Sequence, residues 1–130
     1  MGKQAIVSGK VPPPAGAYSP ALAVGGWLFV SGQGGFDPAT DELVSDEIEA
    51  QTEQAFRNVD ALLEEAGLSR SDIVSCLVHL SDLSLFSRYN AVYERQFPQE
   101  PRPVRTTVGA PLLAGMLIEL TVIAHREAGA

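Results

Sequence analysis

Residues 102–120, "RPVRTTVGAPLLAGMLIEL", place Arg105 and Glu119 in a stretch that otherwise resembles two apolar β-strands around a turn. If the turn is centred near Leu112, the two charged residues are equidistant from it. They would then lie opposite each other on neighbouring antiparallel strands, with both side chains on the same face of the sheet. The stretch therefore predicts a β-hairpin that carries an Arg105–Glu119 cross-strand pair.

Two interpretations of this pair are open. In the first, it is a salt bridge on the surface of a sheet, which contributes little to stability. In the second, it has a function, because a charged pair among apolar neighbours loses hydration and needs another reason to be present. The planar guanidinium of Arg105 could bind a carboxylate through two parallel hydrogen bonds, and Glu119 could activate a water molecule. The second interpretation predicts a site for a small anion with a base beside it.

The rest of the chain alternates strand and helix patterns. Residues 21–32 resemble two strands joined at Gly25–Gly26, since glycine readily adopts the positive φ of a tight hairpin turn. Apolar residues recur with a period of 3.6 in residues 46–67 and 83–97, and residues 72–82 form an apolar run of strand length. These patterns predict two helices that are separated by one strand.

The ends of the two helices have sequence signals of their own. Asp46 with Glu49 resembles a capping pair, Gly67 is expected to end the first helix, and Pro98 is expected to stop the second. The second helix also carries an aromatic stripe made of Phe86, Tyr89, Tyr93 and Phe97.

The predicted order of elements is strand, strand, strand, helix, strand, helix, strand, strand. This order is typical of an α+β fold, and residues 1–130 are expected to form one domain with two helices on one face of a single sheet. The last strand is apolar on both sides, because residues 118, 120, 122 and 124 alternate with the largely apolar residues 117, 121 and 123. Two helices cover only one face, so a second protein surface, most economically another copy of the chain, is expected to cover the other.

Composition limits the functional class. Apolar residues make up 45% of the chain and charged residues 19%, which argues against a disordered protein. The net charge of -7 argues against a nucleic-acid partner, since binding to phosphates requires a basic surface. The sequence shows no targeting signal and no apolar stretch long enough to span a membrane, so we expect a cytoplasmic protein. The single cysteine, Cys76, lies in an apolar strand and is expected to be inert.

Three segments, "GAYSPALAVGGWLFVSGQ", "RPVRTTV" and "MLIELTVIA", resemble the signature segments of the RidA/YjgF/YER057c/UK114 family of enamine and imine deaminases. This resemblance extends over essentially the whole chain. It implies a fold similar to that of chorismate mutase and a homotrimer. The three sheets would face a central barrel, with the helices outside and a pocket at each subunit boundary.

The resemblance also implies an activity, the hydrolysis of 2-iminobutanoate and 2-iminopropanoate to 2-oxo acids and ammonia. In this family pattern, Arg105 matches the arginine that binds the substrate carboxylate, and Glu119 matches the acid that positions or activates water. The matching pocket residues are Tyr18, Ser31, Gly32 and Thr107. No metal or other cofactor is implied.

Several residues depart from the family pattern or have a different expected role. Gly34–Gly35 replaces an apolar residue and a proline, which predicts a wider or more mobile loop near the pocket. Thr107 stands where many members have cysteine, and Ala114 replaces a lysine, so an altered fit of the substrate is expected. Asn90 and Gln33 are expected to make structural hydrogen bonds.

Three classes of function remain open. The first is a deaminase of small 2-imino acids, and the second is a non-catalytic trimeric binder of small carboxylates that uses the same Arg105. The third is the ribonuclease or translation-inhibitor role that is also attached to this family, against which the net charge weighs. His79 and His125 have no acidic or cysteine partner at metal-ligand spacing and are expected to be core or edge residues.

Overall fold

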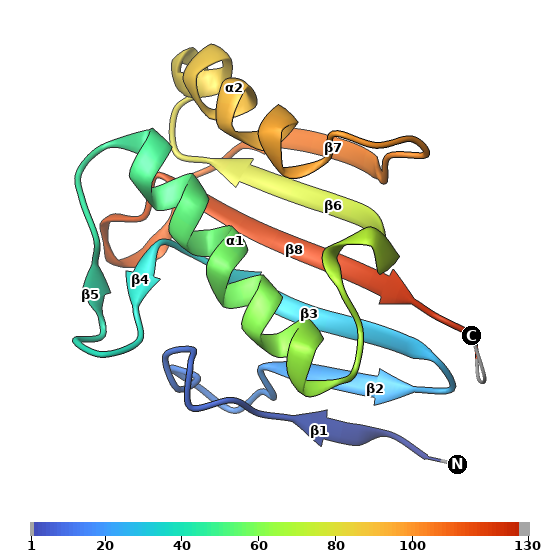
Figure 1. Cartoon of the computed structure of the whole chain (residues 1–130). Helices are drawn as coiled ribbons and strands as arrows, with labels where there is room; N and C mark the ends of the chain where they lie inside the picture. Colours follow the sequence, from blue (N-terminus) through green and yellow to red (C-terminus); the bar gives the residue numbers. More distant parts are fainter. Residues whose placement is uncertain (1, 128–130) are drawn as a thin grey trace.

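The computed structural model describes residues 2–127 and contains a six-stranded sheet with both helices packed on one face (Figure 1). The strand order in the sheet is β1-β2-β3-β8-β6-β7, and β4 and β5 form a separate two-stranded hairpin. The predicted α+β architecture with two helices on one face is confirmed. The elements are β1 Gln4–Ile6, β2 Ala21–Val24, β3 Trp27–Gln33, β4 Phe36–Asp37, β5 Glu42–Leu43, α1 Ile48–Glu65, β6 Ile73–Leu80, α2 Phe86–Gln96, β7 Val104–Gly109 and β8 Ile118–His125.

The predicted hairpin at Gly25–Gly26 is confirmed. Strands β2 and β3 are antiparallel, with Val24 opposite Trp27, and φ is 52° at Gly25 and 86° at Gly26. Both angles lie in the left-handed region, which glycine adopts without the steric penalty of a side chain.

The predicted hairpin between the last two strands is wrong, because β6 lies between β7 and β8. Strand β7 pairs with β6 in parallel, which places Cys76 opposite Arg105. Strand β8 pairs with the other edge of β6 in antiparallel orientation, which places His79 opposite Glu119. Residues 110–117 do not form a tight turn but cross over β6, and they include a short 3₁₀ segment with Ala114 at a φ of 55°.

Helix α1 follows the predicted apolar period and ends as expected at Gly67, whose φ is 76°. Its predicted capping pair is wrong. The helix begins at Ile48, and the residue before it makes no side-chain capping bond. Glu49 accepts hydrogen bonds from Arg88 of α2 instead, and these bonds lower the pKa of Glu49 to about 2. Glu49 was predicted to cap the start of α1, but in the structure it links α1 to α2.

The aromatic stripe of α2 is confirmed. Successive ring centroids are 5.6, 5.9 and 5.1 Å apart from Phe86 through Tyr89 and Tyr93 to Phe97, and the helix ends just before Pro98. Phe56 of α1 packs edge-on against Tyr93 and Phe97. This packing fixes α2 above β6 and β7, where the stripe meets the side chains of β7.

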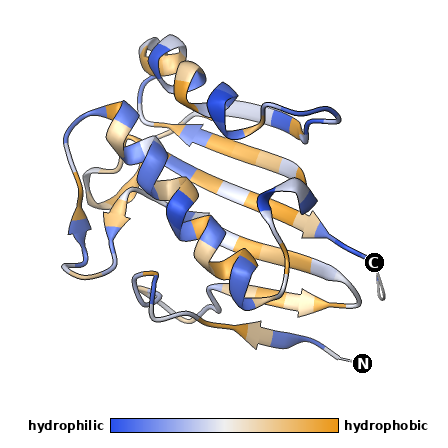
Figure 2. Cartoon of the chain, viewed as in Figure 1, coloured by the Kyte–Doolittle hydropathy of each residue, from blue (hydrophilic) through white to orange (hydrophobic). Residues whose placement is uncertain are grey.

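The two faces of the sheet differ in what covers them. On the helix side, the residues of β8 that point toward α1 are completely buried: Ile118, Leu120, Val122 and Ala124. Figure 2 shows the apolar bands of β3, β6 and β8 beneath the helices. On the other face, Trp27, Phe29 and Leu77 are 42%, 45% and 37% exposed. The predicted second apolar face is therefore present, and what covers it remains a prediction.

Within residues 2–127, neither helix is long and apolar enough to cross a membrane. Cys76 is buried, and burial raises the pKa of its thiol, which agrees with the expected inert role.

Candidate functional site

The side chain of Arg105 lies on the helix side of the sheet, because its partner in β6, Cys76, faces the core. Its guanidinium carbon is 4.6 Å from the ring centroid of Tyr93, 5.5 Å from that of Phe86 and 5.8 Å from that of Tyr89. Such contacts between a cation and aromatic rings are attractive. The aromatic stripe of α2 therefore holds the charge of Arg105 at the edge of the sheet, where the residue remains exposed.

The hydrogen bonds of Arg105 leave part of its guanidinium free. Nη1 donates to Asn90 Oδ1 at 2.6 Å and to the Tyr89 hydroxyl at 3.3 Å. Among residues 2–127, no group accepts a hydrogen bond from its Nε or Nη2, and no carboxylate forms an ion pair with it. The arginines that do form ion pairs are Arg70, Arg88, Arg95, Arg102 and Arg126. Asn90 makes a structural hydrogen bond as expected, but it does so to the residue at the centre of the site.

Thr107 joins this group from the same face of β7. Its Oγ1 lies 3.2 Å from the Tyr89 hydroxyl, so Arg105 and Thr107 share one neighbour on α2. Burial raises the pKa of Tyr89, so this hydroxyl stays protonated. We call the group made of Arg105, Thr107, Tyr89 and Asn90 the arginine cluster.

Glu119 lies on the opposite face of the sheet, because its neighbours Ile118 and Leu120 point into the core. The predicted Arg105–Glu119 pair is therefore wrong. The carboxylate of Glu119 instead lies directly over Gly32 of β3, where an added Cβ would be 2.6 Å from its Cδ atom. A side chain at position 32 would therefore displace the Glu119 carboxylate from this position.

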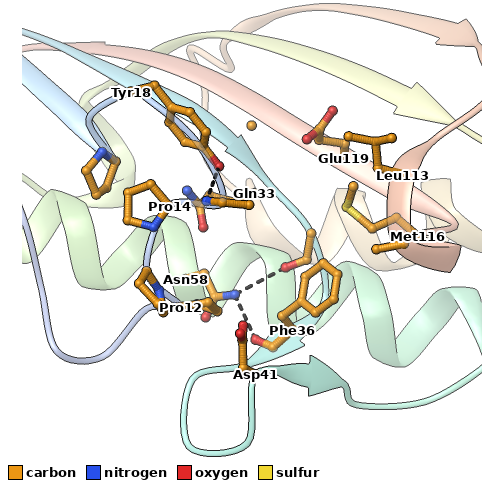
Figure 3. A pocket seen from close by; sticks show the side chains of 16 residues that line it. Pro12, Pro14, Tyr18, Gln33, Phe36, Asp41, Asn58, Leu113, Met116 and Glu119 are labelled. Atoms are coloured by element: carbon orange, nitrogen blue, oxygen red, sulfur yellow. Dashed lines mark hydrogen bonds between the residues drawn. The ribbon is translucent and has the colours of Figure 1, made fainter.

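Glu119, Gly32 and Tyr18 line a pocket of about 410 Å³ (Figure 3). Figure 3 shows Tyr18 and the prolines of the N-terminal segment on one side and Glu119 on the other. The remaining walls come mainly from apolar residues, which include Pro12, Pro13, Pro14, Phe36, Leu113 and Met116. We call this space the glutamate pocket. It combines a largely apolar wall with two carboxylates, those of Glu119 and Asp41, and small-molecule sites commonly place a few polar groups in such a wall.

Ser31 and Gln33, at the end of β3, both make hydrogen bonds to backbone carbonyls. The Ser31 hydroxyl donates to the carbonyl of Ser19 at 2.7 Å, and Ser31 is not among the residues that line the pocket. Gln33 lines the pocket, and its side-chain amide donates to the carbonyl of Ser31 at 3.2 Å, which is the structural bond expected of it. The Tyr18 hydroxyl accepts a hydrogen bond from the backbone N–H of Ala15 at 3.2 Å.

Gly34 and Gly35 pack closely against their neighbours, and the expectation of a wider or more mobile loop stays a prediction. An added Cβ at Gly34 would be 2.4 Å from the sulfur of Met116, and one at Gly35 would be 2.6 Å from the Cα of Gln51. The two glycines therefore let the chain pack closely against α1 and against the wall of the pocket.

The expected site residues thus fall into two separate groups, apart from Ser31, which belongs to neither. Arg105 and Thr107 belong to the arginine cluster, and Tyr18, Gly32 and Glu119 line the glutamate pocket. Glu119 points away from the face of the sheet that carries Arg105. Residues 2–127 contain no group of three or more His, Cys, Asp or Glu side chains that could hold a metal ion.

Sequence reasoning missed the role of Tyr89. Its place in the aromatic stripe indicated packing alone, and only the position of α2 over β7 brings its hydroxyl to Arg105.

Comparison with known proteins shows to which family the chain belongs. The model of the family described as Endoribonuclease L-PSP matches residues 8–126. The chain belongs to the Endoribonuclease L-PSP family. A RutC family protein from Pyrococcus abyssi is 42% identical over 128 residues, which cover 98% of this chain and all of that protein.

Solved structures of L-PSP family relatives have the same fold. RidA from the Antarctic bacterium Psychrobacter sp. is 40% identical with a TM-score of 0.90, over 95% of this chain and 99% of that one. Escherichia coli TdcF, solved with bound serine, is 31% identical with a TM-score of 0.90 over the same shares of the two chains. The resemblance to the RidA/YjgF family is confirmed.

Proposed function

We propose that this protein hydrolyses small 2-imino acids, such as 2-iminopropanoate and 2-iminobutanoate, to the corresponding 2-oxo acids and ammonia. The observation that carries the proposal is the free edge of the Arg105 guanidinium, which is held by Asn90, Tyr89 and three rings but has no carboxylate partner among residues 2–127. A planar guanidinium with free N–H groups on one edge fits a carboxylate through two parallel hydrogen bonds. The serine bound to TdcF carries such a carboxylate, which supports this assignment.

The position of the two groups supports a site that a second copy of the chain completes. Arg105 and Glu119 lie on opposite faces of one sheet, so one chain cannot direct both at one small molecule. A neighbouring copy could bring its arginine cluster to the mouth of the glutamate pocket. We therefore propose a homotrimer in which the exposed apolar faces meet around a central barrel and a pocket forms at each subunit boundary.

In this proposal the substrate carboxylate binds Arg105 and Thr107 of one subunit, and the imine carbon lies near Glu119 of the next. An imine carbon is already electrophilic, so the reaction needs orientation, a water molecule and proton transfer. Glu119 takes a proton from water as the oxygen attacks the carbon. That proton passes to the nitrogen, which gives a neutral carbinolamine. Glu119 then transfers the hydroxyl proton of the carbinolamine to the nitrogen, the C–N bond breaks, ammonia leaves and the C=O of the 2-oxo acid forms. Neither a metal nor a covalent intermediate is needed for this balance.

The assembly gives the first prediction. We expect light scattering at micromolar concentration to report a mass of about three times the chain mass of 13.8 kDa, because burying Trp27, Phe29 and Leu77 against neighbouring copies removes apolar surface from water. A monomer under these conditions would count against the shared pocket.

The activity is tested by coupling the protein to a threonine or serine dehydratase, which releases short-lived imino acids. We expect the protein to accelerate the decay of the imine and the appearance of the 2-oxo acid above the rate in buffer. An unchanged rate, measured with a protein that binds a 2-oxo acid, would favour the second candidate function. That candidate is a non-catalytic binder of small carboxylates, which the serine-bound structure of TdcF supports equally well.

The third class is nucleic-acid cleavage, which the name of the family suggests. The net charge of -7 opposes it, because RNA binding requires cationic side chains against the phosphates. We expect no RNA binding whose affinity falls as salt is added, as measured by fluorescence anisotropy with a labelled single strand. Tight binding that weakens steeply with salt would contradict this prediction.

A further inference from the structure

Tyr89 occupies a central position in the arginine cluster. The residue is completely buried, and its hydroxyl lies 3.3 Å from Arg105 Nη1 and 3.2 Å from Thr107 Oγ1. Both of these neighbours are assigned to substrate binding in the proposed function, while Tyr89 itself does not face the pocket residues. Its contacts suggest that it acts on the substrate through them.

The first consequence concerns the orientation of Arg105. A guanidinium has five N–H groups, of which Nη1 carries two. One of these donates to Asn90 Oδ1 at 2.6 Å and the other to the Tyr89 hydroxyl at 3.3 Å. Both protons of Nη1 are thereby used. The edge left for a carboxylate is the one formed by Nε and Nη2, neither of which has an acceptor among residues 2–127.

The second consequence concerns the proton of Thr107. The Tyr89 oxygen accepts from Arg105, so its own proton needs an acceptor, and within residues 2–127 that acceptor is Thr107 Oγ1. If Thr107 donated instead, the phenol proton would be buried without a partner, which is costly. Burial also raises the pKa of Tyr89, so the proton stays on the phenol. Hydrogen bonds therefore run from Arg105 to Tyr89 and from Tyr89 to Thr107, which leaves the Thr107 proton available to a ligand.

We propose that Tyr89 is a positioning residue that fixes which edge of Arg105 binds the substrate carboxylate and turns Thr107 into a hydrogen-bond donor toward it. This proposal rests on the proposed function, since it assumes that the arginine cluster binds a carboxylate. It also gives Thr107 a role that a cysteine would fill poorly, because a thiol is a weak acceptor for the Tyr89 proton.

The test is Tyr89→Phe, which removes the hydroxyl and keeps the ring under Arg105. We expect the Kd for 2-oxobutanoate, measured by calorimetry, to rise roughly tenfold, as for the loss of one buried hydrogen bond to a charged group. In the coupled assay, KM should rise by a similar factor while kcat changes less. Thr107→Val should weaken binding equally, Thr107→Ser should restore it, and the double variant Tyr89→Phe with Thr107→Val should be no worse than either single change.

The matched control is Thr52→Val, which removes a buried hydroxyl from α1, where it donates to the Ile48 carbonyl. This variant should lose stability without a change in Kd. Binding by folded Tyr89→Phe within twofold of wild type would overturn the proposal. If Tyr89→Phe does not fold, equal binding by Thr107→Val and Thr107→Ser would overturn it, and a loss confined to Thr107→Val would support it.

The outcomes also separate this proposal from the deaminase proposal. A wild-type protein that binds 2-oxobutanoate without turnover would refute the deaminase, while the loss in Tyr89→Phe would still support the role of Tyr89. A wild-type protein that does not bind 2-oxobutanoate at all would overturn both.

Discussion

Replacing Arg105 by alanine is expected to abolish deamination while the protein stays folded and trimeric. The side chain is exposed at the edge of the sheet and is not part of the buried core, so its removal costs little stability. It is the residue whose free edge is assigned to the substrate carboxylate. Its loss should weaken binding of a 2-oxo acid by roughly 2 to 5 kcal/mol, the usual cost of leaving a desolvated charge without its partner. Calorimetry with 2-oxobutanoate and the coupled imine assay measure the two effects.

The charge-retaining variant Arg105→Lys separates geometry from charge. A lysine ammonium is a compact charge without the planar fork, and it cannot donate to Asn90 and Tyr89 while presenting two parallel N–H groups to a ligand. We therefore expect strong impairment in this variant too. Arg95→Ala is the matched control, because it removes an exposed arginine of α2 that pairs with Glu53 outside the site. Near-normal rates for Arg105→Ala on a folded trimer would contradict the assignment.

Much of the fold follows from local patterns that the structure leaves intact. The period of α1, the aromatic stripe of α2 and the glycine pair of the β2–β3 turn all depend on residues close together in the sequence. The predicted pairing of β7 with β8 was wrong, because β7 pairs with β6. A register counted from a presumed turn near Leu112 assumes that neighbours in sequence pair in space. The apolar strand β6 accepts β7 on one edge and β8 on the other, and no local pattern shows this.

The sequence indicated candidate residues for a site but not how they are arranged. Arg105 and Glu119 were chosen as a facing pair, and the structure places them on opposite faces of the sheet. This separation makes the assembly more important to the proposed function, since a complete site then needs two chains. Tyr89 could not be predicted as a site residue, because the contact of its hydroxyl with Arg105 depends on how α2 sits over β7.

Glu119→Gln is expected to behave differently from Arg105→Ala, retaining the binding of a 2-oxo acid but losing turnover. Glutamine keeps the shape of the side chain that lies over Gly32. It lacks the carboxylate that would take a proton from water, and removal of a general base typically costs a factor of about 10² to 10⁴ in rate. The loss should therefore appear in kcat of the coupled assay, with a Kd for 2-oxobutanoate close to that of the wild type.

The separate effects on Kd and on kcat test whether the two faces of the sheet have different roles, one in substrate binding and the other in catalysis. In the proposed trimer, Arg105 holds the substrate from one subunit and Glu119 acts on water from the next, so each variant removes one task. Mixing the inactive variants Arg105→Ala and Glu119→Gln and letting their subunits exchange should then restore part of the activity, because some boundaries combine an intact Arg105 with an intact Glu119. The control mixes Glu119→Gln with Glu65→Gln, a variant of an exposed glutamate outside the site. This mixture shows how much activity is recovered when only one of the two variants lacks a site residue. Absence of recovery in the first mixture, with exchange verified, would mean that both residues serve the same subunit's pocket and would refute the shared site.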